Sequence, residues 1–193
     1  MNNFSKIAVV DIETTGFLNQ GGLIVEVAIA ELDTNNGNTA LVFESVVREK
    51  AFRITHTRHP FGWIFQHSDL TPADVFAAPL FEDVRPVMQS VLDGYPAGAT
   101  AFNKDFDFPF LRSRGLVIRD LPCIMKTACP VLNLPSKKGY STPKWPNVQE
   151  AWDFFFRHSG YHEAHRAADD ALHEAMILYQ LIKLGAYHFE MSQ

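Results

Sequence analysis

Residues 7–13, with the sequence IAVVDIE, form an apolar run that ends in two acidic side chains. Apolar residues on both alternating faces indicate a central β-strand that is covered on two sides. Asp11 and Glu13 are two residues apart, so on a strand both leave the same face, about 6.6 Å from each other. Two ionised carboxylates at that distance repel by about 2.5 kcal/mol at an effective dielectric constant of about 20. The run therefore predicts a covered sheet whose first strand carries two acids that need a compensating partner.

This acidic pair has two interpretations. Buried carboxylates are normally paired with a cation or protonated, and hard oxygen ligands on a rigid strand suit magnesium or manganese. In the other interpretation the strand ends at the surface, and water solvates both acids. The spacing of Asp11 and Glu13 alone leaves both interpretations open.

The pattern after the first strand predicts an antiparallel meander. Residues 23–32 and 39–48 are typical of strands, and residues 33–38 between them form a polar hairpin turn. A short apolar segment at residues 99–102 is expected to form a later strand. Because helical segments alternate with and follow these strands, we expect an α/β fold in which helices flank a mixed central sheet.

Helices are predicted from capping residues and from apolar spacing. Thr71 before Pro72 is typical of a helix start, and apolar residues recur at helical spacing over residues 81–91. Pro109 suits the first turn of a helix, which places Asp107 near a helix start. The apolar stripe of the last helix is expected to consist of Leu172, Ala175, Met176, Tyr179 and Ile182.

The length and composition are those of one globular domain, which we expect to cover residues 1–193. Apolar residues make up 47% and charged residues 20%, which excludes a disordered chain and a disulfide scaffold. Cys123 and Cys129 form neither a CxxC pair nor a Cys/His array, so a structural zinc site is not expected. The free thiols, and the lack of a signal-like or membrane-length apolar segment, predict a cytoplasmic protein without membrane contact.

Charge is distributed unevenly along the chain. The net charge of −5 argues against a protein that coats nucleic acid non-specifically, because such binding depends on lysine and arginine contacts to phosphate. Residues 100–144 nevertheless contain eight basic and three acidic residues. This stretch, with Lys137 and Lys138 in a loop predicted over residues 136–147, could present a basic rim to a polyanion. The alternative is that these charged side chains lie on surface loops and have no binding role.

Three short motifs occur in a fixed order along the chain: residues 11–16 read DIETTG, residues 102–107 read FNKDFD, and residues 165–171 read HRAADDA. Together they resemble the three motifs of the DEDDh family of 3′–5′ exonucleases, which includes proofreading subunits and RNase T-like enzymes. The resemblance extends over about residues 7–182. It implies a ribonuclease H-like fold.

The resemblance also implies roles for individual residues. It assigns Asp11, Glu13, Asp107 and Asp170 as metal ligands and His165 as the general base. Asp169 and Asp170 are adjacent, and only the five-residue step from His165 selects Asp170 as the ligand. A tyrosine at the position of Arg166 would have indicated the sister DEDDy family. Where many relatives have Asp-Thr, this chain has Lys126 and Thr127. Substrate contacts are assigned to Thr14, Phe17, Leu70, Asn103 and Phe106.

Phe17 and the histidines also have less specific interpretations. Phe17 directly follows Gly16, and in similar enzymes an apolar side chain here wedges against terminal bases; the alternative is that Phe17 belongs to the core. His56, His59, His67 and His158 receive no role.

The expected function is metal-dependent 3′–5′ exonuclease activity, with DNA favoured, that releases nucleoside 5′-monophosphates. Two Mg²⁺ or Mn²⁺ ions per active site are expected as cofactors, and His165 would take a proton from the attacking water. The expected partners are single-stranded 3′ ends and a polymerase or another replication or repair protein, as in proofreading. The alternatives are a 3′–5′ exoribonuclease of RNase T or oligoribonuclease type and a non-catalytic nucleic-acid-binding adaptor. The complete set of acids and histidine argues against the adaptor.

Overall fold

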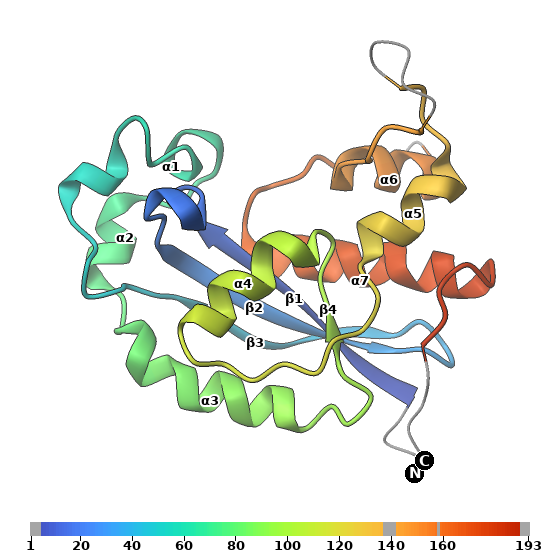
Figure 1. Cartoon of the computed structure of the whole chain (residues 1–193), viewed down its shortest axis with the longest axis horizontal. Coiled ribbons are helices and arrows are strands. Elements are labelled where there is room, and N and C mark those ends of the chain that lie inside the picture. Colours follow the sequence, from blue (N-terminus) through green and yellow to red (C-terminus); the bar gives the residue numbers. More distant parts are fainter. Residues whose placement is uncertain (1–4, 137–141, 158, 190–193) are drawn as a thin grey trace.

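The computed structural model describes residues 5–136, 142–157 and 159–189. Within these residues the chain forms one four-stranded sheet in the order β3-β2-β1-β4 (Figure 1). Antiparallel pairing joins β1 to β2 and β2 to β3, whereas β4 runs parallel to β1. The predicted mixed sheet is confirmed. Its strands are β1 (Lys6–Thr14), β2 (Ile24–Asp33), β3 (Thr39–Val46) and β4 (Ala99–Thr100).

The predicted helices follow the strands in the expected order, and the structure adds the short helices η2, η3 and α1 and the longer helix α5. The segment that becomes α5 was not predicted, because no side-chain cap marks its start and Pro130 lies inside it. No helix in the described part of the chain is long and apolar enough to cross a membrane. The helices are η2 (Leu18–Gln20), η3 (Ile54–Thr57), α1 (Ile64–His67), α2 (Pro72–Ala77), α3 (Phe81–Asp93), α4 (Lys104–Ser113), α5 (Ile124–Leu132), α6 (Val148–Phe155) and α7 (Ala167–Lys183).

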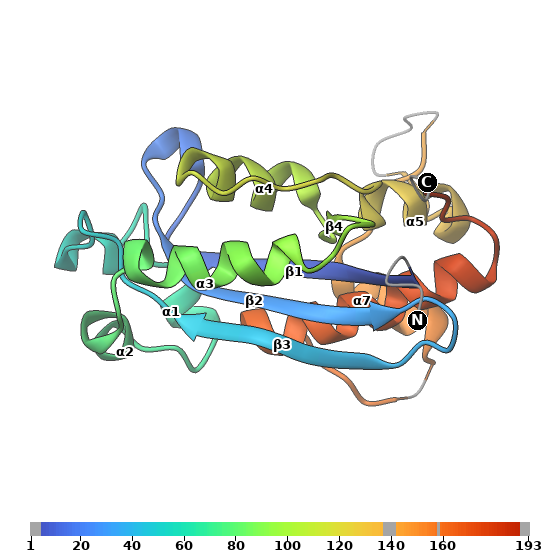
Figure 2. The ribbon, with the colours of Figure 1, turned by 90° about the horizontal axis from the view of Figure 1, so that it is seen from below.

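The two faces of β1 pack against different sets of helices. Ile7 and Val9 share a buried cluster with residues of α5, α6 and α7, whereas Ala8, Val10 and Ile12 pack with residues of α3 and α4. Figure 2 shows α4 and α7 on opposite sides of the strands. Because side chains alternate along a strand, Asp11 and Glu13 lie on the face that Ile7 and Val9 begin.

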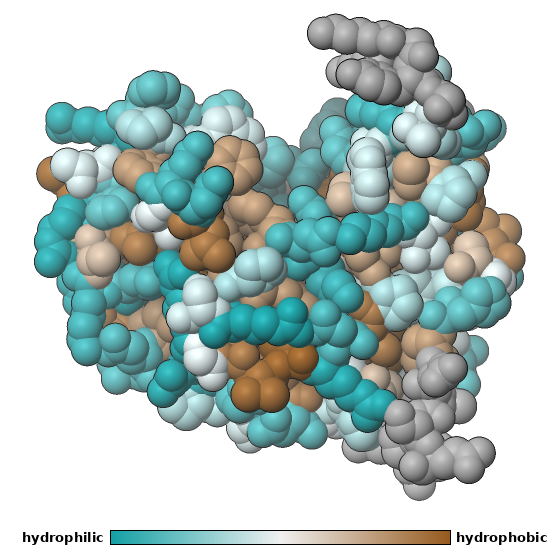
Figure 3. Space-filling view, viewed as in Figure 1, coloured by the Kyte–Doolittle hydropathy of each residue, from teal (hydrophilic) through white to brown (hydrophobic). Residues whose placement is uncertain are grey.

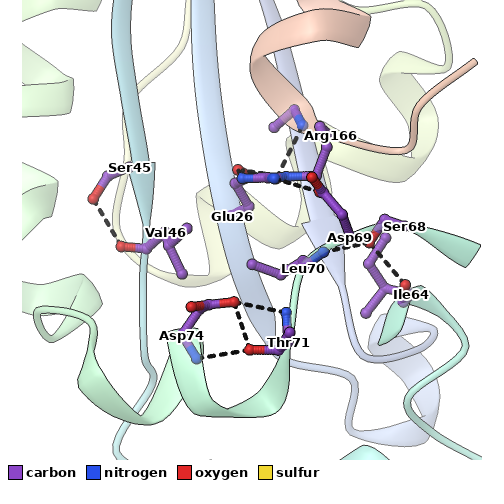
Figure 4. Close-up of polar contacts among 11 residues, drawn as sticks. Glu26, Ser45, Val46, Ile64, Ser68, Asp69, Leu70, Thr71, Asp74 and Arg166 are labelled. Atoms are coloured by element: carbon purple, nitrogen blue, oxygen red, sulfur yellow. Dashed lines mark hydrogen bonds and ion pairs between the residues drawn. The ribbon is translucent and has the colours of Figure 1, made fainter. Parts of the chain in front are cut away.

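Local sequence signals explain where several helices begin. α2 begins after Thr71, whose hydroxyl accepts a hydrogen bond from the Asp74 N–H at 3.2 Å, while the Asp74 carboxylate accepts from the Thr71 N–H at 2.8 Å (Figure 4). This capping box confirms the predicted start. The prediction for Pro109 was wrong, because α4 begins at Lys104 and Pro109 lies beyond its first turn. Asp107 nonetheless lies in the first turn, as predicted.

The buried face of α7 differs from the predicted stripe. Leu172, Met176, Tyr179 and Ile182 are only partly buried at the margin of the core. Of the predicted stripe, Ala175 alone is fully buried. The most deeply buried apolar residues of α7 are Ala167, Ala171, Ala175, Ile177, Leu178 and Leu181.

Candidate active site

Four predicted metal ligands line one cleft of about 290 Å³. Asp11 and Glu13 come from the end of β1, Asp107 from the first turn of α4, and Asp170 from the first turn of α7. The cleft is bordered on one side by α5 and the start of α6. In Figure 3 the upper margin of the molecule is notched. Acids from three separate parts of the sequence therefore converge on one site.

The topology of the sheet brings these acids together. β4 lies parallel to β1, and α4 begins four residues after β4 ends, so the first turn of α4 lies near the end of β1. α7 packs across β1 and β2 on the face that carries Asp11 and Glu13. Its first turn thereby brings Asp170 to the same place.

Burial raises the free-energy cost of ionising the acids in this cluster. Asp107 is 4% exposed and Asp170 is 2% exposed. Desolvation raises the pKa of Asp107 to about 8 and that of Asp170 to about 7. Desolvation, together with repulsion from neighbouring carboxylates, raises the pKa values of Asp11 and Glu13 well above their usual range. Asp11 and Glu13 are partly buried and line the cleft, which favours their interpretation as compensated acids over freely solvated ones.

The donor atoms of the cluster fit a divalent cation. Asp11 Oδ2 is buried and accepts no hydrogen bond. Ligand atoms of Glu13, His165 and Asp170 lie within 4.8 Å of one another. Among the described residues, no lysine or arginine forms an ion pair with any of the four acids. Clustered hard oxygen ligands without a side-chain cation suit Mg²⁺ or Mn²⁺.

His165 stands at the mouth of this cluster in an unusual backbone conformation. Its φ of 51° lies in the left-handed region, which costs energy for a residue with a Cβ and is frequent at functional sites. The His165 Nδ1 atom lies 3.8 Å from Glu163 Oε1, and the ring meets Trp63 edge-on at a centroid distance of 4.9 Å. Burial, with a smaller contribution from His67, lowers the pKa of His165, which favours the neutral imidazole, the form that can accept a proton.

Arg166 fixes the backbone directly after His165. Its guanidinium donates from Nε and Nη2 to the Glu26 carboxylate on β2, at 2.7 to 3.1 Å, and from Nη1 to Asp69 at 2.5 Å (Figure 4). The same Glu26 carboxylate accepts the N–H of Ala167 at 3.1 Å. The first residue of α7 and its neighbour are therefore tied to the sheet. Sequence reasoning missed this network, because Glu26 and Arg166 are 140 residues apart.

The structure separates the two adjacent aspartates that begin α7. Asp170 lines the cleft, and its Oδ1 atom accepts a hydrogen bond from the Tyr161 hydroxyl at 3.1 Å. Asp169 is not among the residues that line the cleft, and its Oδ2 atom lies 3.3 Å from His173 Nδ1. Tyr161 is another functional neighbour that the sequence did not indicate.

Two further carboxylates, Glu163 and Glu174, line the cleft beside the four predicted ligands, and Glu174 was also missed. It lies four residues after Asp170 on α7, is 2% exposed, and lines the cleft together with the four predicted ligands. The signal was available in the sequence, since residues four apart lie on the same face of a helix. A glutamate outside the three motifs was not considered.

The predicted substrate contacts divide into two groups. Asn103 and Phe106 line the cleft, and Phe106 also lines a neighbouring hollow of about 480 Å³ together with Thr14, Phe17 and Trp63. Phe17 is 61% exposed and meets Phe106 edge-on, so its interpretation as a core residue is wrong.

Leu70 does not reach the cleft or the hollow. It is 2% exposed and packs in a small separate cluster with Ile64 and Val75. A substrate contact by the Leu70 side chain is therefore incompatible with the structure. The reason is that α1 and α2 enclose the residue from both sides in the sequence.

The basic stretch is largely neutralised where the structure describes it. Lys104 and Arg112 pair with Asp120, and Lys126 pairs with Asp105. Lys126, the departure from the family pattern, thus has a partner on α4. Arg114 and Lys144 pair with Glu49 and Glu150. The predictions for Lys137 and Lys138 concern residues outside the described part of the chain, and so does the unassigned His158.

Comparison with known proteins identifies the family. A sequence model of the exonuclease family RNase_T matches residues 8–178. The chain belongs to this exonuclease family. The predicted family and the predicted enzyme class, a hydrolytic exonuclease, are confirmed by this match. No curated protein sequence matches the chain.

Solved structures share the fold of this RNase_T family member. The nuclease domain of 3′hExo, a DEDDh family member bound to rAMP, has a TM-score of 0.67 at 14% identity, with 100% of this chain and 99% of that chain covered. A 3′-exonuclease that recognises the histone mRNA stem-loop has a TM-score of 0.63 at 13% identity, covering 95% and 84%. Cell-death related nuclease 4 has a TM-score of 0.65 at 14% identity, and the chain spans 65% of its length. The predicted ribonuclease H-like fold is confirmed.

Proposed function

We propose that this chain is a metal-dependent 3′–5′ exonuclease that removes nucleoside 5′-monophosphates from single-stranded 3′ ends, as a single domain. The observation that carries the proposal is the convergence of Asp11, Glu13, Asp107 and Asp170 with His165 in one cleft. Membership of an exonuclease family supports hydrolysis, and likeness of fold to 3′-exonucleases supports attack from the 3′ end.

The four carboxylates would hold two Mg²⁺ or Mn²⁺ ions. Such ions supply the positive charge that a phosphodiester needs near so many acids and lower the pKa of a coordinated water. The protein itself contributes rigid ligand placement, since β1, α4 and α7 are all packed against the core. Burial of Asp107 and Asp170 keeps competing water away from the ligand atoms.

His165 would act as the general base. With Nδ1 facing Glu163, the Nε2 atom would accept a proton from the attacking water as its oxygen bonds to phosphorus. The P–O bond to the departing 3′-oxygen would break, and solvent water would protonate that oxygen. The Arg166 network would keep the imidazole oriented during this transfer. A neutral imidazole is required, which agrees with the lowered pKa of His165.

The hollow beside the cleft suits a terminal base. Phe17, Trp63 and Phe106 line it, and stacking on aromatic rings binds any base with about 1–3 kcal/mol each. Glu13 borders both the hollow and the cleft, so a base held there would place its own phosphate near the acids. This arrangement supports one-nucleotide steps from a single-stranded end.

RNA is the second candidate substrate class. One structural neighbour recognises a histone mRNA stem-loop, and another was determined with rAMP. These neighbours favour an exoribonuclease over the DNA preference that the sequence predicts. The complete acid cluster argues against a non-catalytic adaptor. A polymerase partner and a cytoplasmic location remain predictions.

Three substrates of one sequence would test the proposal: 5′-labelled single-stranded DNA, duplex DNA with a recessed 3′ end, and single-stranded RNA. In Mg²⁺ we expect a ladder that shortens from the 3′ end, and none in EDTA or with Asp107→Asn. Glu44→Gln, an exposed change on β3, should cut at the wild-type rate. Internal cleavage, 5′ shortening or persistent activity in EDTA would refute the proposal. The ratio of DNA to RNA rates decides between the two substrate classes.

A further inference from the structure

Two buried glutamates near the cleft differ in how their charge is compensated. Glu26 is 5% exposed and forms a bidentate ion pair with Arg166. Glu174 is 2% exposed, and no lysine or arginine forms an ion pair with it in the described part of the chain. A buried ionised carboxylate is costly, so Glu174 is either protonated or compensated by a positive charge from elsewhere.

The surroundings of Glu174 show where that charge can bind. Glu174 lines the same cleft as Asp11, Asp107 and Asp170 and lies one helical turn after Asp170. Its Oε2 atom accepts the backbone N–H of Phe102 at 3.1 Å. Phe102 lies between β4 and α4, two residues before the helix that carries Asp107. The hydrogen bond therefore fixes the Glu174 carboxylate between the elements that carry Asp107 and Asp170.

We infer that Glu174 is a fifth carboxylate of the divalent-ion site, held in place by Phe102 and contributing its charge to ion binding. The inference rests on the proposed function and extends the ligand set beyond the three motifs. A purely structural role would need only the hydrogen bond to Phe102. The charge and the hydrogen bond can be separated by substitution.

Two conservative variants separate them. Glu174→Gln keeps the side-chain size and an oxygen that can accept the Phe102 N–H, but it removes the charge. Glu174→Asp keeps the charge but shortens the reach toward Phe102. Glu44→Gln makes the same chemical change as the first variant on an exposed position of β3 and serves as the control.

The primary measurement is a calorimetric titration of the full chain with Mn²⁺ alone. We expect Glu174→Gln to weaken Mn²⁺ binding by about tenfold or more, in the range seen when a partner of a metal ligand is removed. Glu174→Asp should remain within about threefold of wild type, and Glu44→Gln should be unchanged. In EDTA, Glu174→Gln should melt at or above the wild-type temperature, because removing one charge reduces repulsion among the acids.

Wild-type Mn²⁺ affinity in folded Glu174→Gln would overturn the inference. If that variant does not fold, Glu174→Asp decides, since a tenfold loss of affinity despite retained charge would also overturn it. Failure of the proposed function looks different, because wild-type protein would then neither bind Mn²⁺ nor shorten any oligonucleotide. An active wild type with an unaffected Glu174→Gln refutes the fifth carboxylate alone.

Discussion

At the scale of single residues, His165 combines a strained backbone with a partly exposed imidazole ring. Its φ of 51° and its contacts with Glu163 and Trp63 hold the imidazole at the cleft mouth. Its distance from ligand atoms of Glu13 and Asp170 is also compatible with a direct ligand. The two roles, general base and metal ligand, lead to different expected effects when the imidazole is removed.

We expect His165→Ala to slow single-turnover cleavage by about 10²–10⁴-fold, the usual contribution of general-base catalysis, while Mn²⁺ affinity stays near wild type. The wild-type rate should fall as pH drops through the pKa of His165, because a protonated imidazole cannot accept a proton. That acidic limb should be absent in the variant. Lost Mn²⁺ affinity, or a retained acidic limb at full rate, would show that His165 is not the base.

Phe17 is the residue whose exposure most clearly separates function from folding. We expect Phe17→Ala to weaken productive substrate binding by about 1–3 kcal/mol, the value of one base stacked on an aromatic ring. Stability should change little, because the side chain is 61% exposed, whereas truncation of a core phenylalanine costs about 3–5 kcal/mol. Denaturant melts and KM measurements on one oligonucleotide separate the two effects. A large loss of stability with unchanged KM would contradict the stacking role.

At the scale of elements, the start of α7 is tied to β2 by the Arg166–Glu26 network. The same helix carries Asp170 and Glu174, so this attachment sets the depth of both carboxylates in the cleft. Arginine suits the task because its planar guanidinium binds a carboxylate with two hydrogen bonds.

Arg166→Lys should therefore slow catalysis by displacing the start of α7, because Arg166 itself takes no part in the chemical step. We expect kcat to fall at least tenfold with little change in KM, and unfolding free energy to fall by about 1–2 kcal/mol. That cost is below the 3–5 kcal/mol of a fully buried broken pair, since 32% of the Arg166 side chain is exposed. Arg112→Lys, at the exposed pair with Asp120, is the matched control and should change neither quantity. Equal effects of both variants would contradict the positioning role.

At the scale of the whole molecule, the acid cluster couples stability to pH and to metal. The raised pKa values of Asp107, about 8, and Asp170, about 7, mean that the folded protein binds protons that the unfolded chain releases. Their stabilising contribution is present at low pH and is lost as pH rises through 7 and 8. Each group contributes a slope of at most about 1.4 kcal/mol per pH unit.

In EDTA we expect the melting temperature to fall between pH 6 and pH 9. Mg²⁺ should raise it, and by more at pH 9 than at pH 6, because a bound cation compensates ionised carboxylates. Asp170→Asn should reduce the pH slope in EDTA. Scanning calorimetry between pH 6 and pH 9 tests this. A melting temperature that does not vary with pH in EDTA, or that varies equally in EDTA and in Mg²⁺, would contradict the prediction.

The sequence alone determined the features that depend on local order. Alternation along β1 placed Asp11 and Glu13 on one face of the sheet, Thr71 and Pro72 marked the start of α2, and the order of three short motifs indicated the family. Each of these signals consists of short runs of consecutive residues that can be recognised without knowing which elements pack together.

Tertiary structure decided what depends on residues far apart in the chain. Burial of Leu70, exposure of Phe17 and the partly buried stripe of α7 follow from which elements pack together, and local hydropathy does not specify that. The Arg166–Glu26 pair spans 140 residues, and the contact between Glu174 and Phe102 spans 72. A carboxylate looks the same in sequence whether an arginine, water or a metal ion compensates it, and only its three-dimensional neighbours determine which.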